Sequence, residues 1–172
     1  MSEVAIIHDL EARLALKAGV DIVANAVKRT MGPRGRNVAY RPDLGAPRIT
    51  QDGVSVAREI RLGNGFLQTG AAIIVEACRL TNAAAGDGTT TAAVLTQAMT
   101  RQAYRAVAAG ADPMRVRHGI AAAVGRVDNT IRQQATPIAT LREISWVAGL
   151  SAHDPHLGER IASIFDRYGP GA

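Results

Sequence analysis

Aromatic residues are scarce in this sequence, and cysteine occurs only once. Phe, Tyr and Trp make up 3% of the 172 residues, whereas Ala and Gly are abundant. Small residues of this kind favour closely packed helices over a β-sandwich. The single cysteine, Cys78, excludes an intrachain disulfide, and its apolar neighbours predict a buried, unreactive thiol.

Long hydrophobic runs are also missing. No apolar run approaches the roughly 20 residues that a membrane-spanning helix needs. The N-terminus does not have the basic region followed by an apolar block that is typical of a signal peptide. The sequence therefore predicts no membrane partner and a cytoplasmic location.

Lysine is nearly absent, and arginine supplies 18 of the 20 basic residues. The formal net charge of +5 would suit a nucleic-acid partner. The arginines are spread along the chain with acidic residues between them, however, and no run of about five like charges occurs. We therefore interpret them as solvated helix faces and predict no nucleic-acid partner. With 47% hydrophobic residues, the chain can form a real core.

Helical periodicity predicts a long amphipathic helix over about residues 8–29. Its apolar face contains an i,i+4 ladder and four further aliphatic residues that widen it: Leu10, Leu14, Ala18, Ile22 and Ala26, with Leu16, Val20, Val23 and Val27. Gly32 and Pro33 end this helix. A short β-hairpin follows, with its turn near Asp43-Leu44-Gly45, then a second turn at Asp52-Gly53 and an ambiguous stretch over 54–60.

Five more helices are predicted, over about 66–85, 89–109 and 113–134, from the capping box Thr140–Glu143 onward, and from Asp154-Pro155 to Tyr168. The fold class is thus mainly α with a small β-hairpin. The Thr136-Pro137 break suggests a boundary between residues 1–136 and 137–172. Trp146 is expected to lie in the core with its aliphatic neighbours.

The turn Gly86-Asp87-Gly88 before Thr89, Thr90 and Thr91 carries the strongest chemical signal. The glycines allow a close backbone approach, and the first turn of a helix offers unpaired N–H groups and a positive dipole end. This pattern predicts an anion site. Asp87 would repel a bare phosphate but suits one that carries Mg²⁺. The alternative is simple helix capping by Asp87 or Thr89.

Two weaker turns have the same ambiguity. Thr30 to Gly35 could expose backbone and hydroxyl groups to phosphate, or could only end a helix. Asp52-Gly53 taken alone is an ordinary turn. Neither a Walker loop nor a Rossmann fingerprint is present. His153 and His156 are expected at the surface and not at a metal.

Together these stretches resemble the group I chaperonins of the GroEL type. The resemblance rests on residues 26–38, 45–47, 49–60 with DGVSVAREI, 84–91 with AAGDGTTT, and 106–114, and it extends from about Leu14 to Tyr168. It implies that residues 1–136 form a partial, multihelical equatorial ATP-binding domain. Residues 137–172 would form two short helices of a partial intermediate domain. The apical domain and the C-terminal half of the equatorial domain would be absent.

The resemblance also implies that ATP and Mg²⁺ are bound. The nucleotide-binding positions are Thr30, Met31, Gly32, Pro33, Gln51, Gly53, Asp87, Gly88, Thr89, Thr90 and Thr91. Asp87 and Asp52 would serve the metal, and Asp52 would have a supporting role near the γ-phosphate. Leu150 and Ser151 match positions near the nucleotide. Gln51 departs from the lysine usual in the family, which removes one positive charge.

The implied function is that of a truncated chaperonin subunit in ATP-dependent protein folding. Its expected partners are other chaperonin subunits in a ring, with co-chaperonin and unfolded polypeptides only for full-length members. Because the matched part contains neither the apical domain nor the hydrolytic carboxylate, we expect the chain alone not to enclose or bind clients and not to hydrolyse ATP efficiently. Whether it is an enzyme is left open. The alternative is a non-enzymatic module that binds full-length subunits, for instance through the hairpin at Asn37–Tyr40.

Overall fold

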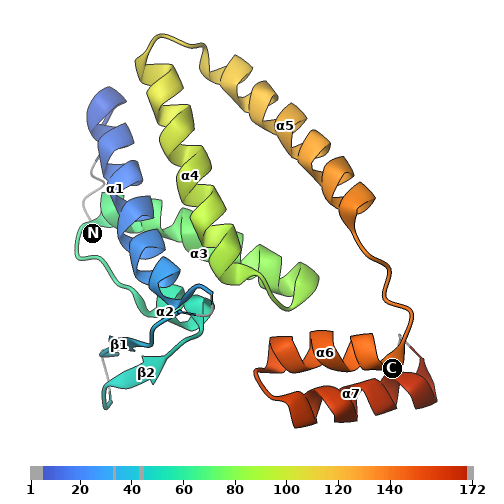
Figure 1. The fold of residues 1–172 in the computed structure, drawn as a ribbon. Helices are drawn as coiled ribbons and strands as arrows, with labels where there is room; N and C mark the ends of the chain where they lie inside the picture. The colour runs from blue at the N-terminus through green and yellow to red at the C-terminus, as the bar shows by residue number, and fades with distance from the viewer. Residues whose placement is uncertain (1–5, 33, 43–44, 170–172) are drawn as a thin grey trace. The chain divides into compact units, whose positions relative to one another are not determined.

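The computed structural model describes residues 6–32, 34–42 and 45–169. The described part is mainly helical with one two-stranded sheet, as predicted (Figure 1). The elements follow in the order α1 (Asp9–Val27), η1 (Lys28–Thr30), β1 (Val38–Tyr40), β2 (Arg48–Thr50), α2 (Gly53–Glu59), α3 (Gly65–Ala85), α4 (Thr89–Ala108), α5 (Pro113–Gln134), α6 (Leu141–Ala152) and α7 (Pro155–Tyr168).

The chain forms two compact units, Met1–Ile120 and Ala121–Ala172. The division falls inside α5, whereas the sequence suggests a boundary after that helix, at Thr136-Pro137. No described helix is long and apolar enough to cross a membrane.

The core of the first unit lies where α1, α2, α3 and α4 meet. Its buried hydrophobic residues are Val20, Val23, Ala24, Val27, Val54, Val56, Ala57, Ala71, Ile74, Cys78 and Ala93. The prediction that Cys78 is buried is confirmed. Helices α1 and α3 touch through glycine. A Cβ on Gly70 would lie 2.1 Å from the carbonyl oxygen of Leu16, and one on Gly19 would lie 2.0 Å from that of Leu67. The two backbones therefore approach closely because both positions lack a side chain.

The predicted helix over residues 8–29 is confirmed, but its apolar face is only partly buried. Val20, Val23 and Val27 are at most 1% exposed, whereas Leu10 and Leu14 are 65% and 54% exposed. The i,i+4 ladder was therefore the wrong guide to the buried face. The contact with α3 through Gly19 turns the valine side of α1 inward.

The predicted hairpin is present as an antiparallel pair in which Val38 faces Thr50 and Tyr40 faces Arg48. The residues expected at its turn, Asp43 and Leu44, lie outside the described residues, as does Pro33. The ambiguous stretch after the hairpin is helix α2.

Side chains begin several helices as the sequence predicts. Asp112 Oδ1 accepts from the N–H of Arg115, Thr140 and Glu143 form the capping box of α6, and Asp154 caps α7. Each cap satisfies N–H groups that have no partner within the helix. These starts depend only on residues within one turn of each other.

The second unit contains the antiparallel pair α6 and α7, which meet through small residues. A Cβ on Gly158 would lie 2.4 Å from the carbonyl oxygen of Ser145, and Ala162 is buried beside it. Trp146 is 57% exposed, so the prediction that it lies in the core was wrong. The close approach of the two helices leaves no room for an indole between them. The guanidinium of Arg142 lies 4.8 Å from the centre of the Trp146 ring instead.

Candidate functional site

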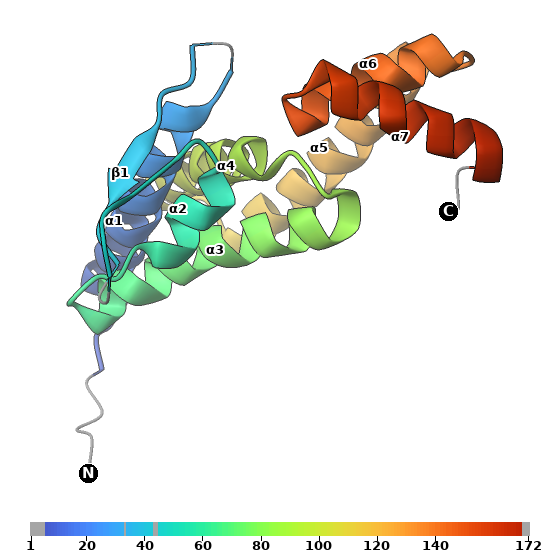
Figure 2. The same ribbon diagram turned by 90° about the horizontal axis from the view of Figure 1, so that it is seen from below.

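Three segments that the sequence singled out meet at one end of the first unit. They are the end of α1 with η1, the start of α2 and the start of α4. Figure 1 and Figure 2 show α2 beside the end of α1 and against α3. The hydroxyl oxygens of Thr30 and Thr90 lie 3.4 Å apart. A Cβ on Gly53 would lie 2.4 Å from the Thr90 hydroxyl oxygen. Thr30, Gly53 and Thr90 are thus in mutual contact.

The two hydroxyl groups differ in what they can still donate. Thr30 Oγ1 donates to the carbonyl oxygen of Val27 at 2.8 Å. Since a hydroxyl has one proton, Thr90 is the one left to donate, either to Thr30 or to an anion. Both threonines are half-buried, so a ligand there would be partly shielded from water.

The turn before α4 places a glycine at the N-cap of that helix. Gly86 and Gly88 have φ values of 71° and 79°, in the left-handed region that favours glycine. Asp87 Oδ1 accepts from the N–H of Gly88 at 2.6 Å. The N-cap of α4 is Gly88, which has no side chain to cap the helix. Thr89 is the first helical residue, so it is not the cap that simple capping would require.

Cys78 of α3 forms a hydrogen bond to the start of α4, a contact that the sequence did not indicate. Its Sγ donates to the carbonyl oxygen of Thr89 at 3.3 Å. Burial raises the pKa of the Cys78 thiol, and the negative charge of Asp52 raises it further. The thiol therefore stays protonated and acts as a donor. Its place in the buried stripe of α3 was the only available signal.

Asp52 is the N-cap of α2. Its carboxylate accepts from the N–H groups of Val54 and Ser55, each at 3.1 Å, and from the Ser55 hydroxyl at 2.6 Å. Burial raises the pKa of Asp52, but these hydrogen bonds outweigh it and the pKa is lowered. Asp52 is therefore ionised, and three donors already occupy its oxygens.

The other predicted nucleotide-binding residues that the structure describes are not in the direct contact that joins Thr30, Gly53 and Thr90. Met31, Gly32, Gln51, Asp87, Gly88 and Thr91 are exposed in turns or at helix starts around the Thr30 and Thr90 contact. Leu150 and Ser151 belong to α6 in the second unit. Among the described residues, no group of three or more His, Cys, Asp and Glu side chains forms a ready metal site. A bound Mg²⁺ would need oxygens from its phosphate ligand.

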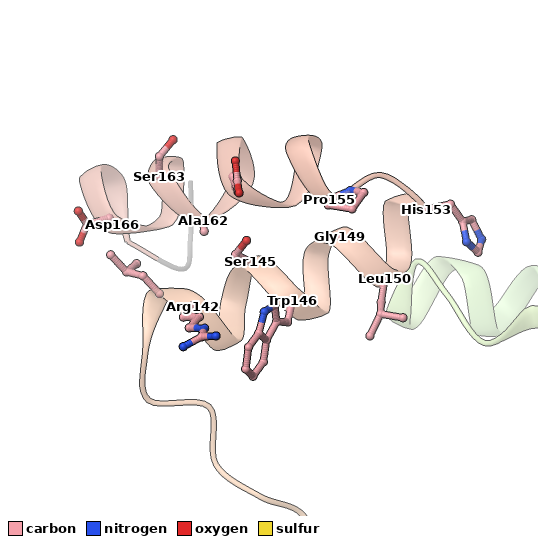
Figure 3. A pocket seen from close by; sticks show the side chains of 12 residues that line it. Arg142, Ser145, Trp146, Gly149, Leu150, His153, Pro155, Ala162, Ser163 and Asp166 are labelled. Atoms are coloured by element: carbon pink, nitrogen blue, oxygen red, sulfur yellow. The ribbon is translucent and has the colours of Figure 1, made fainter. Parts of the chain in front are cut away.

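The second unit contains a separate surface hollow of about 910 Å³ between α6 and α7 (Figure 3). Ser145 and Ala162 lie between the helices, while Ser163 points away from α6, and Trp146 and Arg142 point away from α7. None of the predicted phosphate-binding residues lines this hollow. Leu150, which the resemblance matches to a position near the nucleotide, does line it.

Comparison with known proteins shows that this fold is similar to that of chaperonins. The sequence model of the TCP-1/cpn60 chaperonin family matches residues 23–164. The structure is similar to that of the chaperonin gp146 from the bacteriophage EL 2 (Pseudomonas aeruginosa), determined in the presence of ATP-BeFx. The TM-score is 0.79 at 25% identity, over 98% of this chain and 30% of that one. A group III chaperonin in the open state gives a TM-score of 0.79 at 22% identity, over 94% of this chain and 34% of that one.

The chain thus spans about a third of the length of these two chaperonins. The family match covers α2, α3, α4, α5 and α6 entirely, and so includes the start of α4 with its glycines and threonines. With the fold and the family match in agreement, the chain belongs to the TCP-1/cpn60 chaperonin family.

Proposed function

We propose that this chain binds Mg-ATP and contributes the phosphate-binding part of an ATP-dependent protein-folding machine. One observation carries the proposal: the Thr30 and Thr90 hydroxyls meet over Gly53 at the start of α4, a helix whose N-cap has no side chain. Such a helix start attracts anions through its N–H groups and its dipole.

The proposed roles follow from position. The N–H groups of Thr89, Thr90 and Thr91 and their hydroxyls bind phosphate oxygens, and the exposed turn at Met31 and Gly32 presents backbone groups beside them. Pro33, Gln51, Gly53 and Gly88 complete the nucleotide-binding set. Asp87 and Asp52 serve Mg²⁺, which neutralises phosphate charge when bound. The gp146 chaperonin, whose structure was determined in the presence of ATP-BeFx, has a similar fold over 30% of its chain.

Asp52 is proposed as a supporting residue and not as the general base. Its pKa is lowered, and a carboxylate with a low pKa is a weak base. Its oxygens are also engaged in capping α2. We therefore expect binding with slow turnover at best.

The proposal is tested by titrating the purified chain with Mg-ATP in a calorimeter. Thr90→Val and Asp87→Ala should each weaken binding by at least about tenfold, since each removes a charged or hydrogen-bonding partner of a charged ligand. The matched controls are Thr130→Val and Asp166→Ala, which change exposed residues far along the sequence. A folded chain that does not bind Mg-ATP, or that loses binding equally in the controls, would refute the proposal.

A second function is favoured by the exposed aliphatic side chains. Large apolar residues more than 40% exposed occur on α3, α4 and α5, among them Leu80, Leu95, Met99, Val124, Val127 and Ile131. The first three lie in the first unit and the last three in the second, and exposed apolar side chains are typical of protein–protein contacts where they gather into a patch. A non-enzymatic role in binding other chaperonin subunits would cover these side chains. Co-purification with a full-length ring supports this role, and a cooperatively melting monomer that ignores the ring contradicts it.

A further inference from the structure

A polar cluster joins α1 to α4 inside the first unit. Gln97 of α4 is only 4% exposed, and its Nε2 donates to Asp21 Oδ1 at 2.7 Å and to Asn25 Oδ1 at 3.2 Å. Arg101 Nε donates to Asp21 Oδ1 at 2.8 Å, and Lys17 Nζ donates to Asp21 Oδ2 at 2.9 Å. We call these five residues the Asp21 cluster. Three of its hydrogen bonds cross between the helices.

Hydrogen bonds between two helices restrict the sliding of one helix along the other more than apolar contacts do. The other buried residues along these helices are small or aliphatic, such as Ala24 and Ala93. Apolar burial has no direction, so it tolerates a shift of one helix along the other. A shift would leave the Gln97 amide buried without a partner, which is costly. Buried polar groups are known to specify helix register for this reason.

The cluster and the phosphate site lie on the same pair of helices. Helices α1 and α4 run antiparallel and side by side (Figure 1). Thr30 lies nine positions after Asp21, in η1, which continues α1. Along α4, Gln97 and Arg101 lie seven and eleven positions after Thr90. A slip by one residue moves Thr90 by about 1.5 Å, which is large against the 3.4 Å between the two hydroxyl oxygens.

We propose that Asp21, Gln97 and Arg101 are positioning residues that fix the register of α4 on α1 and so hold Thr90 opposite Thr30. Their side-chain hydrogen bonds in the described part of the chain stay within the Asp21 cluster, so they act on Thr90 through the helix between. The expected consequence for nucleotide affinity rests on the function proposed above, whereas the effect on the start of α4 does not.

The cluster provides its own matched control. Lys17 and Arg101 both donate to Asp21 and have similarly exposed side chains, 36% and 41%. Lys17 lies on α1 with Asp21, whereas Arg101 reaches across from α4. Lys17→Met and Arg101→Met therefore remove one cation each from the same carboxylate, but only the second removes a bond between the helices.

The test compares these variants in the whole chain by ¹H–¹⁵N NMR and by Mg-ATP titration. In Arg101→Met, the amide signals of Thr89, Thr90 and Thr91 should move, although they lie three turns from the substitution. Mg-ATP affinity should fall about tenfold, as expected when a residue that orients a ligand-binding group is lost. Lys17→Met should leave those signals and the affinity within about twofold of the parent chain. A second variant, Gln97→Met, should behave like Arg101→Met.

The outcomes separate the two proposals. Unmoved Thr89–Thr91 signals in folded Arg101→Met or Gln97→Met overturn the register proposal, as do equal changes in Lys17→Met. If Arg101→Met does not fold, Gln97→Met tests the register proposal instead, because methionine keeps the volume of the buried Gln97 side chain. A parent chain that does not bind Mg-ATP refutes the proposed function. The register proposal is then tested only by the amide signals of Thr89–Thr91 in the variants.

Discussion

The contact over Gly53 can be tested with a single methyl group. In Gly53→Ala, the new Cβ would lie 2.4 Å from Thr90 Oγ1 and 2.8 Å from Val27 Cγ1. Carbon atoms pack at about 3.5–4.0 Å. Val27 is fully buried and cannot retreat, so the strain falls on Thr90 and on the start of α2.

The size of the effect follows from two opposing terms. Alanine is favoured over glycine in a helix by up to about 1 kcal/mol. Forcing an extra methyl group into a filled core costs roughly 1–3 kcal/mol. We expect Gly53→Ala to lower the free energy of unfolding by about 1 kcal/mol. It should also weaken Mg-ATP binding, because the Thr90 hydroxyl must leave its place beside Thr30.

Gly65 provides the matched control for this experiment. It is the first residue of α3 as Gly53 is of α2, and each follows a capping Asn or Asp. Nothing lies within 4 Å of a Cβ built on Gly65. Gly65→Ala should therefore stabilise the chain in urea denaturation followed by circular dichroism. If Gly53→Ala were as stable as Gly65→Ala, the packing described for Thr30, Gly53 and Thr90 would be wrong.

Three further results are expected. Asp52→Ala should lower the free energy of unfolding by about 1 kcal/mol through the lost cap, whereas Asp52→Asn, which can still cap, should change it little in the same urea experiment. Burial raises the pKa of Asp21, but hydrogen bonds from Lys17, Arg101 and Gln97 lower it from 3.8 to about 2. Stability of about 2 kcal/mol should therefore be present above pH 3.8 and lost as the pH falls toward 2, and acid titration of Asp21→Asn should lack this loss. Acrylamide should quench Trp146, the single tryptophan, nearly as well in the folded chain as in urea; strong protection would contradict its exposure.

The helices were largely predictable because their signals are local. The Thr140–Glu143 capping box and the Asp154 cap each act within one turn, so the order of the residues alone specifies them. The stretch over 54–60 could not be assigned because it is short. Its helix depends on the Asp52 cap and on burial of Val54, Val56 and Ala57 against α1 and α3.

The candidate site also has a part that the sequence predicts and a part that only the structure shows. The glycines around Asp87 and the threonines after it predict an anion site from one continuous stretch, and the family resemblance likewise rests on continuous stretches of sequence. Spacing along the chain did not reveal that Asp21 would pair with Gln97 and Arg101. Those partners come from helices that are far apart in the sequence.

By itself, the sequence determined where helices begin and end, the chemistry of the turn before α4, and the family. Only the tertiary structure decided that Thr30 and Thr90 meet beside Gly53, that the valine side of α1 is the buried side, and that Trp146 is exposed. The physical reason is that caps and turns depend on neighbouring residues. The choice of buried face and the meeting of distant hydroxyls depend instead on how closely two backbones can approach, and here the glycines at the α1–α3 contact and at the start of α2 set that approach.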